Sequence, residues 1–197
     1  MTIELDGAFD AAVLALPAGF AHDGVGDRGR VSLFAFHVEK IRTRGLPLLS
    51  FTYPELLWRI AVRRGDERAW WVIACDLHAR GPRWAARRYV RYDVRPNRVE
   101  VAEHRIASRG PAGDLSIGVD NKVEPGAMIE RRPLRVGADA SWQVPWGDDD
   151  GTTSPLRHRI AVETDTLSAV TVGAEVKWDS HAVVRRGREH RCGVARQ

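Results

Sequence analysis

The hydrophobic pattern of this chain consists of short apolar or alternating segments separated by Gly, Pro, Asn and Asp, which is typical of β-strands joined by turns. Residues 31–38 are apolar almost throughout, so we expect a strand that is buried on much of both faces. Residues 56–64 and 69–77 flank Gly65–Arg68, whose composition suits the four-residue tip of a β-hairpin. This hairpin is the best-defined local element of the sequence.

Side chains alternate between the two faces of a strand, so the first hairpin strand has two different faces. One face carries Trp58, Ile60 and Val62, and the other carries Leu57, Arg59, Ala61 and Arg63. Glu55 shares the parity of Arg59. If the strand begins that early, the two charged groups lie on one face, roughly 13 Å apart along the strand. They are too far apart to pair with each other, but both could contact one ligand between them.

Helical spacing is confined to two short stretches. Apolar residues three or four positions apart predict a helix over residues 9–16, and Pro82 suits the first turn of a helix that continues through residues 84–88. Strand-like patterns return at residues 99–106, 114–119, 158–162 and 167–178, and residues 146–155 indicate a long exposed loop.

These elements predict one mostly β domain of the α+β class over residues 1–186. We expect about eight or nine strands and two short helices, arranged as a barrel or a strongly curved antiparallel sheet. Residues 187–197 form a basic tail whose composition is compatible with disorder.

Composition places the chain among ordinary globular proteins. Hydrophobic residues make up 44% and charged residues 28% of its 197 positions, values that favour neither a disordered nor a membrane-embedded chain. Acidic residues such as Glu4 and Asp6 stand where a secretory signal would be basic and then apolar. Two cysteines, Cys75 and Cys192, are too few for a disulfide framework. We therefore expect a cytoplasmic protein without membrane contact, in which Cys75 is an ordinary core residue.

The formal net charge is +4, and arginine supplies most of the positive charge, because lysine occurs only at positions 40, 122 and 177. Arginine and tryptophan interleave over residues 80–92, and residues 185–196 are again basic, as in a nucleic-acid or protein-binding module. Arginine-rich composition can also reflect coding bias, so nucleic acid is the less favoured partner. We expect Trp58, Trp70, Trp71 and Trp84 to fill the core.

Common catalytic motifs are absent from the sequence. It has no glycine-rich phosphate loop, dinucleotide fingerprint, paired CxxC, HExxH or GxSxG. Its seven histidines are scattered without the spacing of a metal site, and Asp148–Asp150 is more typical of a solvated loop than of a cation site. We therefore expect neither a metal nor a cofactor.

Tyr53-Pro54-Glu55-Leu56-Leu57-Trp58-Arg59 places an acid, a base and two aromatics at the start of an apolar strand. Further segments belong with it: Leu16–Gly19, Arg44–Pro47, Gly65, Trp70–Leu77 and Ala85–Tyr89. Together they resemble the uncharacterised family called domain of unknown function 2071, which belongs to the acetoacetate decarboxylase-like superfamily. The resemblance covers roughly residues 10–105. It implies a curved antiparallel sheet closed into a cone or barrel around a central pocket.

Acetoacetate decarboxylase works through a lysine that forms a Schiff base and is activated by a neighbouring cation. The matching stretch here is Tyr89-Val90-Arg91-Tyr92, and no lysine lies between Lys40 and Lys122. Arginine keeps its proton at neutral pH and is a poor nucleophile, so Arg91 cannot replace that lysine. We therefore reject acetoacetate decarboxylase activity for this chain.

The resemblance still implies a pocket, with Glu55 facing it as the catalytic acid or base. The candidate ligand-binding residues are Tyr53, Arg59, Asp76, Arg87, Arg88, Arg91 and Tyr92. The arginines among them could hold a carboxylate with two hydrogen bonds. Alternatively, Glu55 and Arg59 each pair with an opposite charge on a neighbouring strand, and the other arginines form a solvated helix face.

The sequence is compatible with three functions. The leading one is an acetoacetate decarboxylase-like pocket protein that binds a small, anionic organic molecule, either without turnover or as a lysine-independent lyase or hydrolase. The alternative is a basic nucleic-acid or protein-binding module. The third is a structural subunit of an assembly such as a homo-oligomer, because exposed sheet edges can pair with another chain.

Overall fold

The computed structural model of the chain describes residues 1–43, 46–89, 92–124, 134–136, 142–144, 156–185 and 195–196. The strands are β1 (Thr2–Asp10), β2 (Ala21–His22), β3 (Arg28–Thr43), β4 (Leu46–Arg64), β5 (Glu67–Asp76), β6 (Asp93–Arg95), β7 (Arg98–Ala102), β8 (Arg105–Gly110), β9 (Gly113–Glu124), β10 (Leu134–Val136), β11 (Trp142–Val144), β12 (Leu156–Asp165), β13 (Lys177–Arg185) and β14 (Ala195–Arg196). The helices are the 3-10 helix η1 (Ala11–Val13) and the α-helices α1 (Arg80–Tyr89) and α2 (Leu167–Val172).

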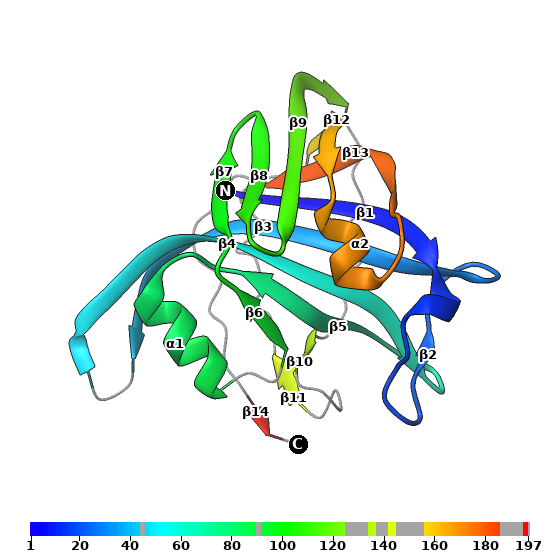
Figure 1. Ribbon diagram of the computed structural model, residues 1–197, viewed down its shortest axis with the longest axis horizontal. Coiled ribbons are helices and arrows are strands. Elements are labelled where there is room, and N and C mark those ends of the chain that lie inside the picture. Colours follow the sequence, from blue (N-terminus) through cyan, green and yellow to red (C-terminus); the bar gives the residue numbers. More distant parts are fainter. Residues whose placement is uncertain are drawn as a thin grey trace.

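All fourteen described strands belong to one sheet, in the order β14-β11-β10-β5-β4-β3-β1-β13-β12-β9-β8-β7, with β2 added to β4 and β6 added to β5. Their pairing is antiparallel except where β6 and β10 join β5. The sheet curls into a half-barrel (Figure 1), so that β7 at its end packs against β3 and β4. There His37 Nε2 donates to the carbonyl oxygen of Val101 at 2.9 Å. The predicted mostly β fold, with a curved sheet and short helices, is confirmed.

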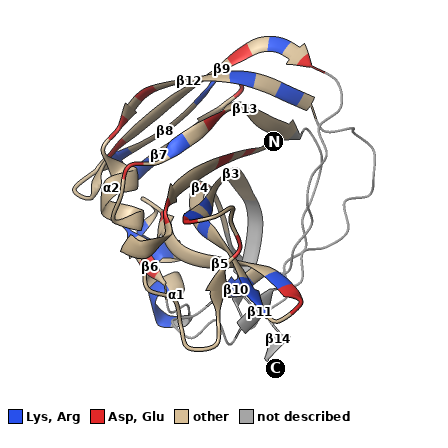
Figure 2. Cartoon of the chain, turned by 90° about the vertical axis from the view of Figure 1, so that its right-hand side faces the viewer, with Lys and Arg blue, Asp and Glu red and all other residues tan. Residues whose placement is uncertain are grey.

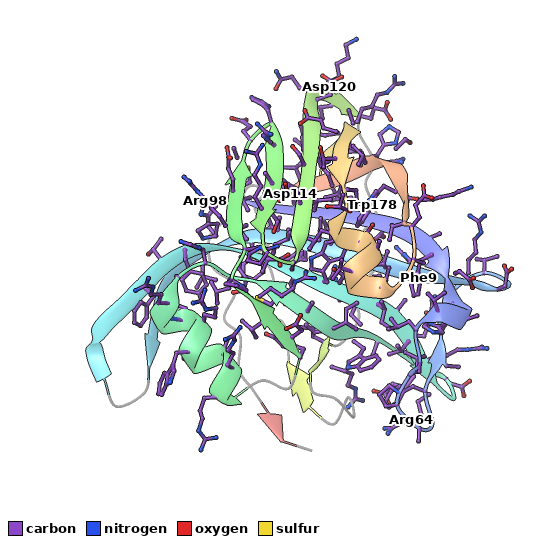
Figure 3. All side chains as sticks on the ribbon, in the orientation of Figure 1. Phe9, Arg64, Arg98, Asp114, Asp120 and Trp178 are labelled. Atoms are coloured by element: carbon purple, nitrogen blue, oxygen red, sulfur yellow. The ribbon has the colours of Figure 1, made fainter. Side chains whose placement is uncertain are left out.

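The two faces of β4 enter two different hydrophobic clusters, as the alternation of its side chains predicts. Leu56, Trp58, Ile60 and Val62 join the main core, to which β1, β3, β5, β7–β9, β13 and α2 also contribute; Phe9 of β1, a member of this core, is labelled in Figure 3. Leu57 and Ala61 join the second core with Phe34, Trp70, Val72, Cys75, Leu77, Val94 and Leu134.

The predicted hairpin is present, but its loop is shorter than expected. β4 and β5 remain paired up to Arg64 and Glu67, so Gly65 and Asp66 alone form the turn. Gly65 has a φ of 60°, a left-handed conformation that glycine adopts without steric cost, and this allows the tighter turn.

The helix predicted over residues 9–16 is wrong, because β1 continues to Asp10 and Phe9 pairs with Gly29 of β3. The Phe9 ring covers Gly29 so closely that a Cβ atom there would lie 2.6 Å from it. Cross-strand pairing and burial of Phe9 therefore outweigh the helical spacing. Only Ala11–Val13 form a 3-10 helix, capped by the Asp10 side chain.

The strand predicted over residues 167–178 is also wrong, because α2 occupies its first half and β13 begins only at Lys177. Leu167 and Val172 are buried in the main core, and Gly173 ends the helix with a φ of 79°. The β-branched residues of this segment favour a strand by propensity, but burial of one helix face decides the structure.

Other predicted elements differ in extent. Residues 99–106 are a hairpin of β7 and β8 rather than one strand, whereas α1 confirms the short helix that contains Pro82 in its first turn. The strand number exceeds the prediction because several strands are only two or three residues long. The loop predicted at 146–155 lies outside the described residues, as does the predicted tail except for β14. No described helix has the length and apolar character required to cross a membrane.

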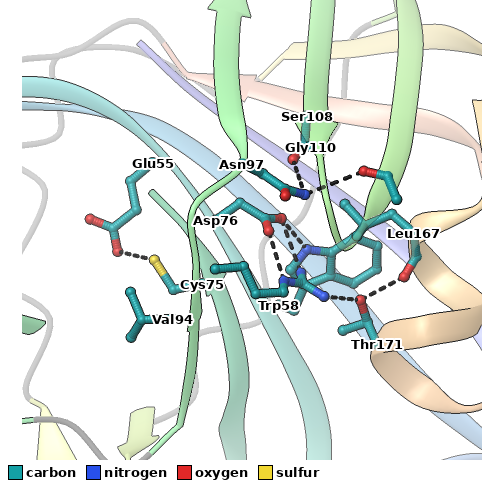
Figure 4. Close-up of polar contacts among 12 residues, drawn as sticks. Glu55, Trp58, Cys75, Asp76, Val94, Asn97, Ser108, Gly110, Leu167 and Thr171 are labelled. Atoms are coloured by element: carbon teal, nitrogen blue, oxygen red, sulfur yellow. Dashed lines mark hydrogen bonds and ion pairs between the residues drawn. The ribbon is translucent and has the colours of Figure 1, made fainter. Parts of the chain in front are cut away.

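A buried ion pair fastens β5 to β6 inside the sheet. Asp76 and Arg95 are both buried, with the Arg95 Nε and Nη2 atoms 2.7 and 3.0 Å from the two carboxylate oxygens of Asp76. The Trp58 indole donates a third hydrogen bond to this carboxylate at 2.9 Å (Figure 4). Arg95 also donates to Thr171 of α2, so the network joins the sheet to the helix.

We expect Asp76→Ala to lower the free energy of unfolding by about 3–5 kcal/mol, because the buried Arg95 guanidinium would lose its counter-charge. Urea denaturation at neutral pH measures this change. The exposed Glu100→Ala is the matched control and should change stability by less than about 0.5 kcal/mol. Equal effects of the two substitutions would contradict the structural role of the pair.

Candidate active site around Glu55

Tyr53, Glu55 and Arg59 lie on the face of β4 that is turned toward the second core. Because β4 begins at Leu46, the condition for Glu55 and Arg59 to share a face is met. Phe36 of β3 lies opposite Glu55 in the register. The predicted common face is therefore confirmed, with an aromatic neighbour beside the carboxylate.

A β-bulge in β5 decides which of its residues join Glu55. The pairing of β4 with β5 is regular from the turn up to Arg59 and then shifts by one position before Trp58, leaving Ile73 as the extra residue. Without this shift, Asp76 would lie opposite Glu55. The bulge therefore changes which face every later residue of β5 occupies.

Asp76 instead lies opposite Leu56 and turns into the main core, where it forms the ion pair with Arg95. Cys75 comes to the face of Glu55 in its place (Figure 4). The structure thus separates Asp76 from Glu55 and adds a cysteine for which the sequence predicts only a packing role.

Four side chains form what we call the Glu55 cluster: Tyr53, Glu55, Cys75 and Tyr92. The Cys75 thiol donates a hydrogen bond to Glu55 Oε1, with the sulfur and oxygen 3.3 Å apart. Tyr53 precedes Glu55 by two positions on β4, and Tyr92 lies between α1 and β6; both phenol side chains pack against the second core. Cys75 is buried and the other three are partly buried.

Burial controls the protonation of this cluster. It raises the pKa of Glu55 from its ordinary 4.5 to about 7, and the hydrogen bond from Cys75 opposes that rise. Burial also raises the pKa of Tyr53, Cys75 and Tyr92, and the negative charge of Glu55 raises each of them further. Near neutral pH the phenols and the thiol therefore keep their protons, and Glu55 is the member that exchanges one.

The Arg59 guanidinium is occupied by contacts within the protein. It is buried, forms an ion pair with Glu4 of β1, and donates to Ser32 Oγ from Nε and Nη2 at 3.2 and 3.1 Å. Its carbon atom lies 4.9 Å from the centre of the Phe34 ring and 4.7 Å from that of Trp70. These contacts correspond to the alternative in which Arg59 pairs with an opposite charge, and Glu4 contributes that charge from two strands away.

The remaining arginines do not meet at Glu55 in the part of the chain that is described. Arg87 donates from Nε and Nη2 to the carbonyl oxygen of Val94, at 3.1 and 2.8 Å, and Arg88 is exposed on α1. Arg91 lies outside the described residues. Arg59 and Arg87 are therefore engaged by contacts within the protein, whereas Arg88 is exposed, and their predicted role in holding an anion stays a prediction.

This arrangement can exchange a proton and donate hydrogen bonds. Glu55 supplies an acid or base near neutral pH, and two protonated phenols close to it can donate to an oxygen atom of a ligand. The described residues contain no group of three His, Cys, Asp or Glu side chains that could hold a metal ion.

Solved structures with the same fold include several enzymes. An acetoacetate decarboxylase-like enzyme from Sphingomonas wittichii RW1 aligns over 92% of this chain and 86% of its own, with 13% identity and a TM-score of 0.60. The enduracididine biosynthesis enzyme MppR, complexed with the condensation product of pyruvate and imidazole 4-carboxaldehyde, aligns over 92% and 82%, with 11% identity and a TM-score of 0.62. An acetoacetate decarboxylase aligns over 99% and 87%, with 13% identity and a TM-score of 0.53.

These similarities show that the fold is acetoacetate decarboxylase-like. No protein-family model matches the sequence, and no curated protein matches it either. The resemblance to the family called domain of unknown function 2071 is therefore not confirmed.

We expect Glu55→Gln to stabilise the protein only at neutral and alkaline pH. The folded protein holds the Glu55 proton up to about pH 7, whereas the unfolded chain releases it near 4.5, so wild-type stability falls as pH rises between these values. Glutamine does not ionise, so the variant should gain up to about 3 kcal/mol over wild type by pH 8 and little at pH 4.5. Urea denaturation across this range measures the difference. Glu100→Gln is the control, and a pH-independent difference for Glu55→Gln would contradict the raised pKa.

We expect substitutions of Cys75 to move the pKa of Glu55 in opposite directions. Cys75→Ala removes a hydrogen bond to the carboxylate and should raise the pKa, whereas Cys75→Ser supplies a stronger donor and should lower it. Carbon-detected NMR titration of the side-chain carboxyl measures both, with the signal assigned by its absence in Glu55→Gln. Identical titration midpoints in all three proteins would show that the thiol contact has no electrostatic effect.

Proposed function

We propose that this chain binds a small organic acid beside Glu55, and that Glu55 donates or accepts a proton there without any Schiff base. The observation that carries the proposal is a carboxyl group with a pKa of about 7 in contact with a thiol, together with two phenols that pack against the same core. The composition of Tyr53–Arg59 further supports assigning the chain to the family called domain of unknown function 2071.

The protonated form of Glu55 is the binding form for an anion. Below pH 7 the neutral carboxyl can donate a hydrogen bond to a ligand carboxylate, and Tyr53 and Tyr92 can donate to a second oxygen. Above pH 7 the ionised carboxylate would repel the same ligand. The complex of a structurally similar enzyme with a condensation product of pyruvate supports small keto acids as the first probes.

Lysine chemistry has little support in this chain. The sequence contains no lysine between Lys40 and Lys122, and the side chains of Lys122 and Lys177 are exposed on β9 and β13. A reaction at this site would therefore be of the lysine-independent lyase or hydrolase type, with Glu55 as its acid or base.

We expect the affinity for pyruvate and related carboxylic acids to be constant below about pH 6 and to fall about tenfold for each pH unit above 7, because binding requires the Glu55 proton. Thermal-shift screening identifies a binding acid, since ligands of the native state raise Tm, and calorimetry then measures Kd across pH. Glu55→Gln should bind with the same affinity at pH 6 and pH 8, whereas Glu100→Gln should follow wild type.

Two results would overturn the proposal. One is that no small carboxylic or keto acid raises Tm at any pH. The other is that the affinity for a binding acid varies with pH in Glu55→Gln as it does in wild type, which would place the titrating group elsewhere.

A further inference from the structure

Trp84 is the exception among the tryptophans that were expected to fill the core. Its side chain is 72% exposed, whereas Trp58 and Trp70 are 0% and 1% exposed. The expectation that Trp84 packs inside is therefore wrong. The reason is the orientation of α1: Ala86 packs against the second core, and Trp84 lies two positions earlier, on the opposite side of the helix.

Two arginines flank Trp84 along the same outward stripe of α1. Arg80 and Arg88 are each four residues from Trp84, which places them on the same helix face, about 6 Å along the axis on either side. Both are exposed, and neither forms an ion pair within the described residues. The helix contains no acidic residue that could neutralise them.

The other two arginines of α1 have contacts within the protein. Arg83 donates from Nη1 to the carbonyl oxygen of His78 at 3.4 Å, and Arg87 donates to that of Val94. These contacts tie the helix to the segments on either side of it. Arg80 and Arg88 are therefore the α1 cations that remain available to a partner, and Figure 2 shows α1 at the margin of the molecule with basic positions along it.

We propose that this outer stripe, Arg80, Trp84 and Arg88, binds a single strand of nucleic acid. One base stacks on the Trp84 ring, and the phosphates on either side of that base contact Arg80 and Arg88. An exposed aromatic ring with a cation on each side supplies both interactions that bind single strands without sequence preference. This surface uses none of the residues of the Glu55 cluster, so it is a second function and does not depend on the first.

Other anionic partners fit the stripe less well. A membrane surface would need a broad apolar face, but the residues that flank Trp84 on this stripe are charged. A duplex has its bases stacked inside and offers no free base face to Trp84. An acidic peptide would satisfy Arg80 and Arg88 but leave the flat face of the ring in water.

Fluorescence anisotropy of a short labelled oligothymidylate, titrated with the full chain at several salt concentrations, tests the proposal. We expect Trp84→Ala to weaken binding roughly 5- to 150-fold, the loss typical of one stacked base. Arg80→Ala and Arg88→Ala should each reduce the slope of log affinity against log salt by about 0.7, the change for one phosphate contact on a single strand. The exposed Arg98→Ala on β7 is the matched control and should leave Kd and slope unchanged.

The outcomes separate the possible partners. Unchanged affinity in Trp84→Ala, or no binding at low salt, would overturn the proposal. It would also be overturned if anionic phospholipid vesicles or polyglutamate bound more tightly than the oligonucleotide and competed with it. Because the three side chains are exposed, their substitution should not affect folding, which circular dichroism of each variant verifies.

Discussion

The hydrogen-bonded register of β4 between β3 and β5 determines where Tyr53, Glu55, Arg59 and Cys75 lie. A slip of one residue would exchange Trp58 and Arg59 between the two faces of the sheet, because side chains alternate along a strand. Each face opposes such a slip. On one face Arg59 pairs with Glu4, and on the other Trp58 donates to Asp76; a slip would separate both contacts and leave a charge buried without its partner.

The same register produces two carboxylates with different chemistry. The Asp76 carboxylate lies 2.7 Å from Arg95 Nε and stabilises the fold. Glu55 is acidic too and lies nearby on the neighbouring strand, but it contacts a thiol, which carries no positive charge. Burial is the largest influence on the pKa of both carboxyl groups and raises both, but Arg95 opposes the rise at Asp76, whereas only the Cys75 hydrogen bond opposes it at Glu55, whose pKa reaches about 7. Environment, not residue type, thus separates the structural acid from the candidate proton donor.

Sequence periodicity predicts which face of a strand a side chain occupies, because this depends only on neighbouring positions in the same strand. It places Glu55 with Arg59, and it separates Trp58 from Leu57, because alternation is a local property. It cannot predict the bulge at Ile73, since one extra residue leaves no mark in an apolar run. That single residue turns Asp76 into the main core and brings Cys75 to the face of Glu55. Nor does periodicity identify the partner of Arg59, because Glu4 lies 55 residues away in the chain.

The α1 helix is a second case in which the sequence predicts an element but not which of its side chains are exposed. Its position was predicted from Pro82, but the exposure of Trp84 depends on which side of the helix meets the sheet, and that is fixed by Ala86 and the second core. The second core also contains Cys75 and borders Tyr92. A ligand on the outer stripe could therefore influence Glu55 only by moving α1. The bond from Arg87 to Val94 ties the helix to β6 and resists that motion, so the two surfaces should act independently unless α1 and β6 move together.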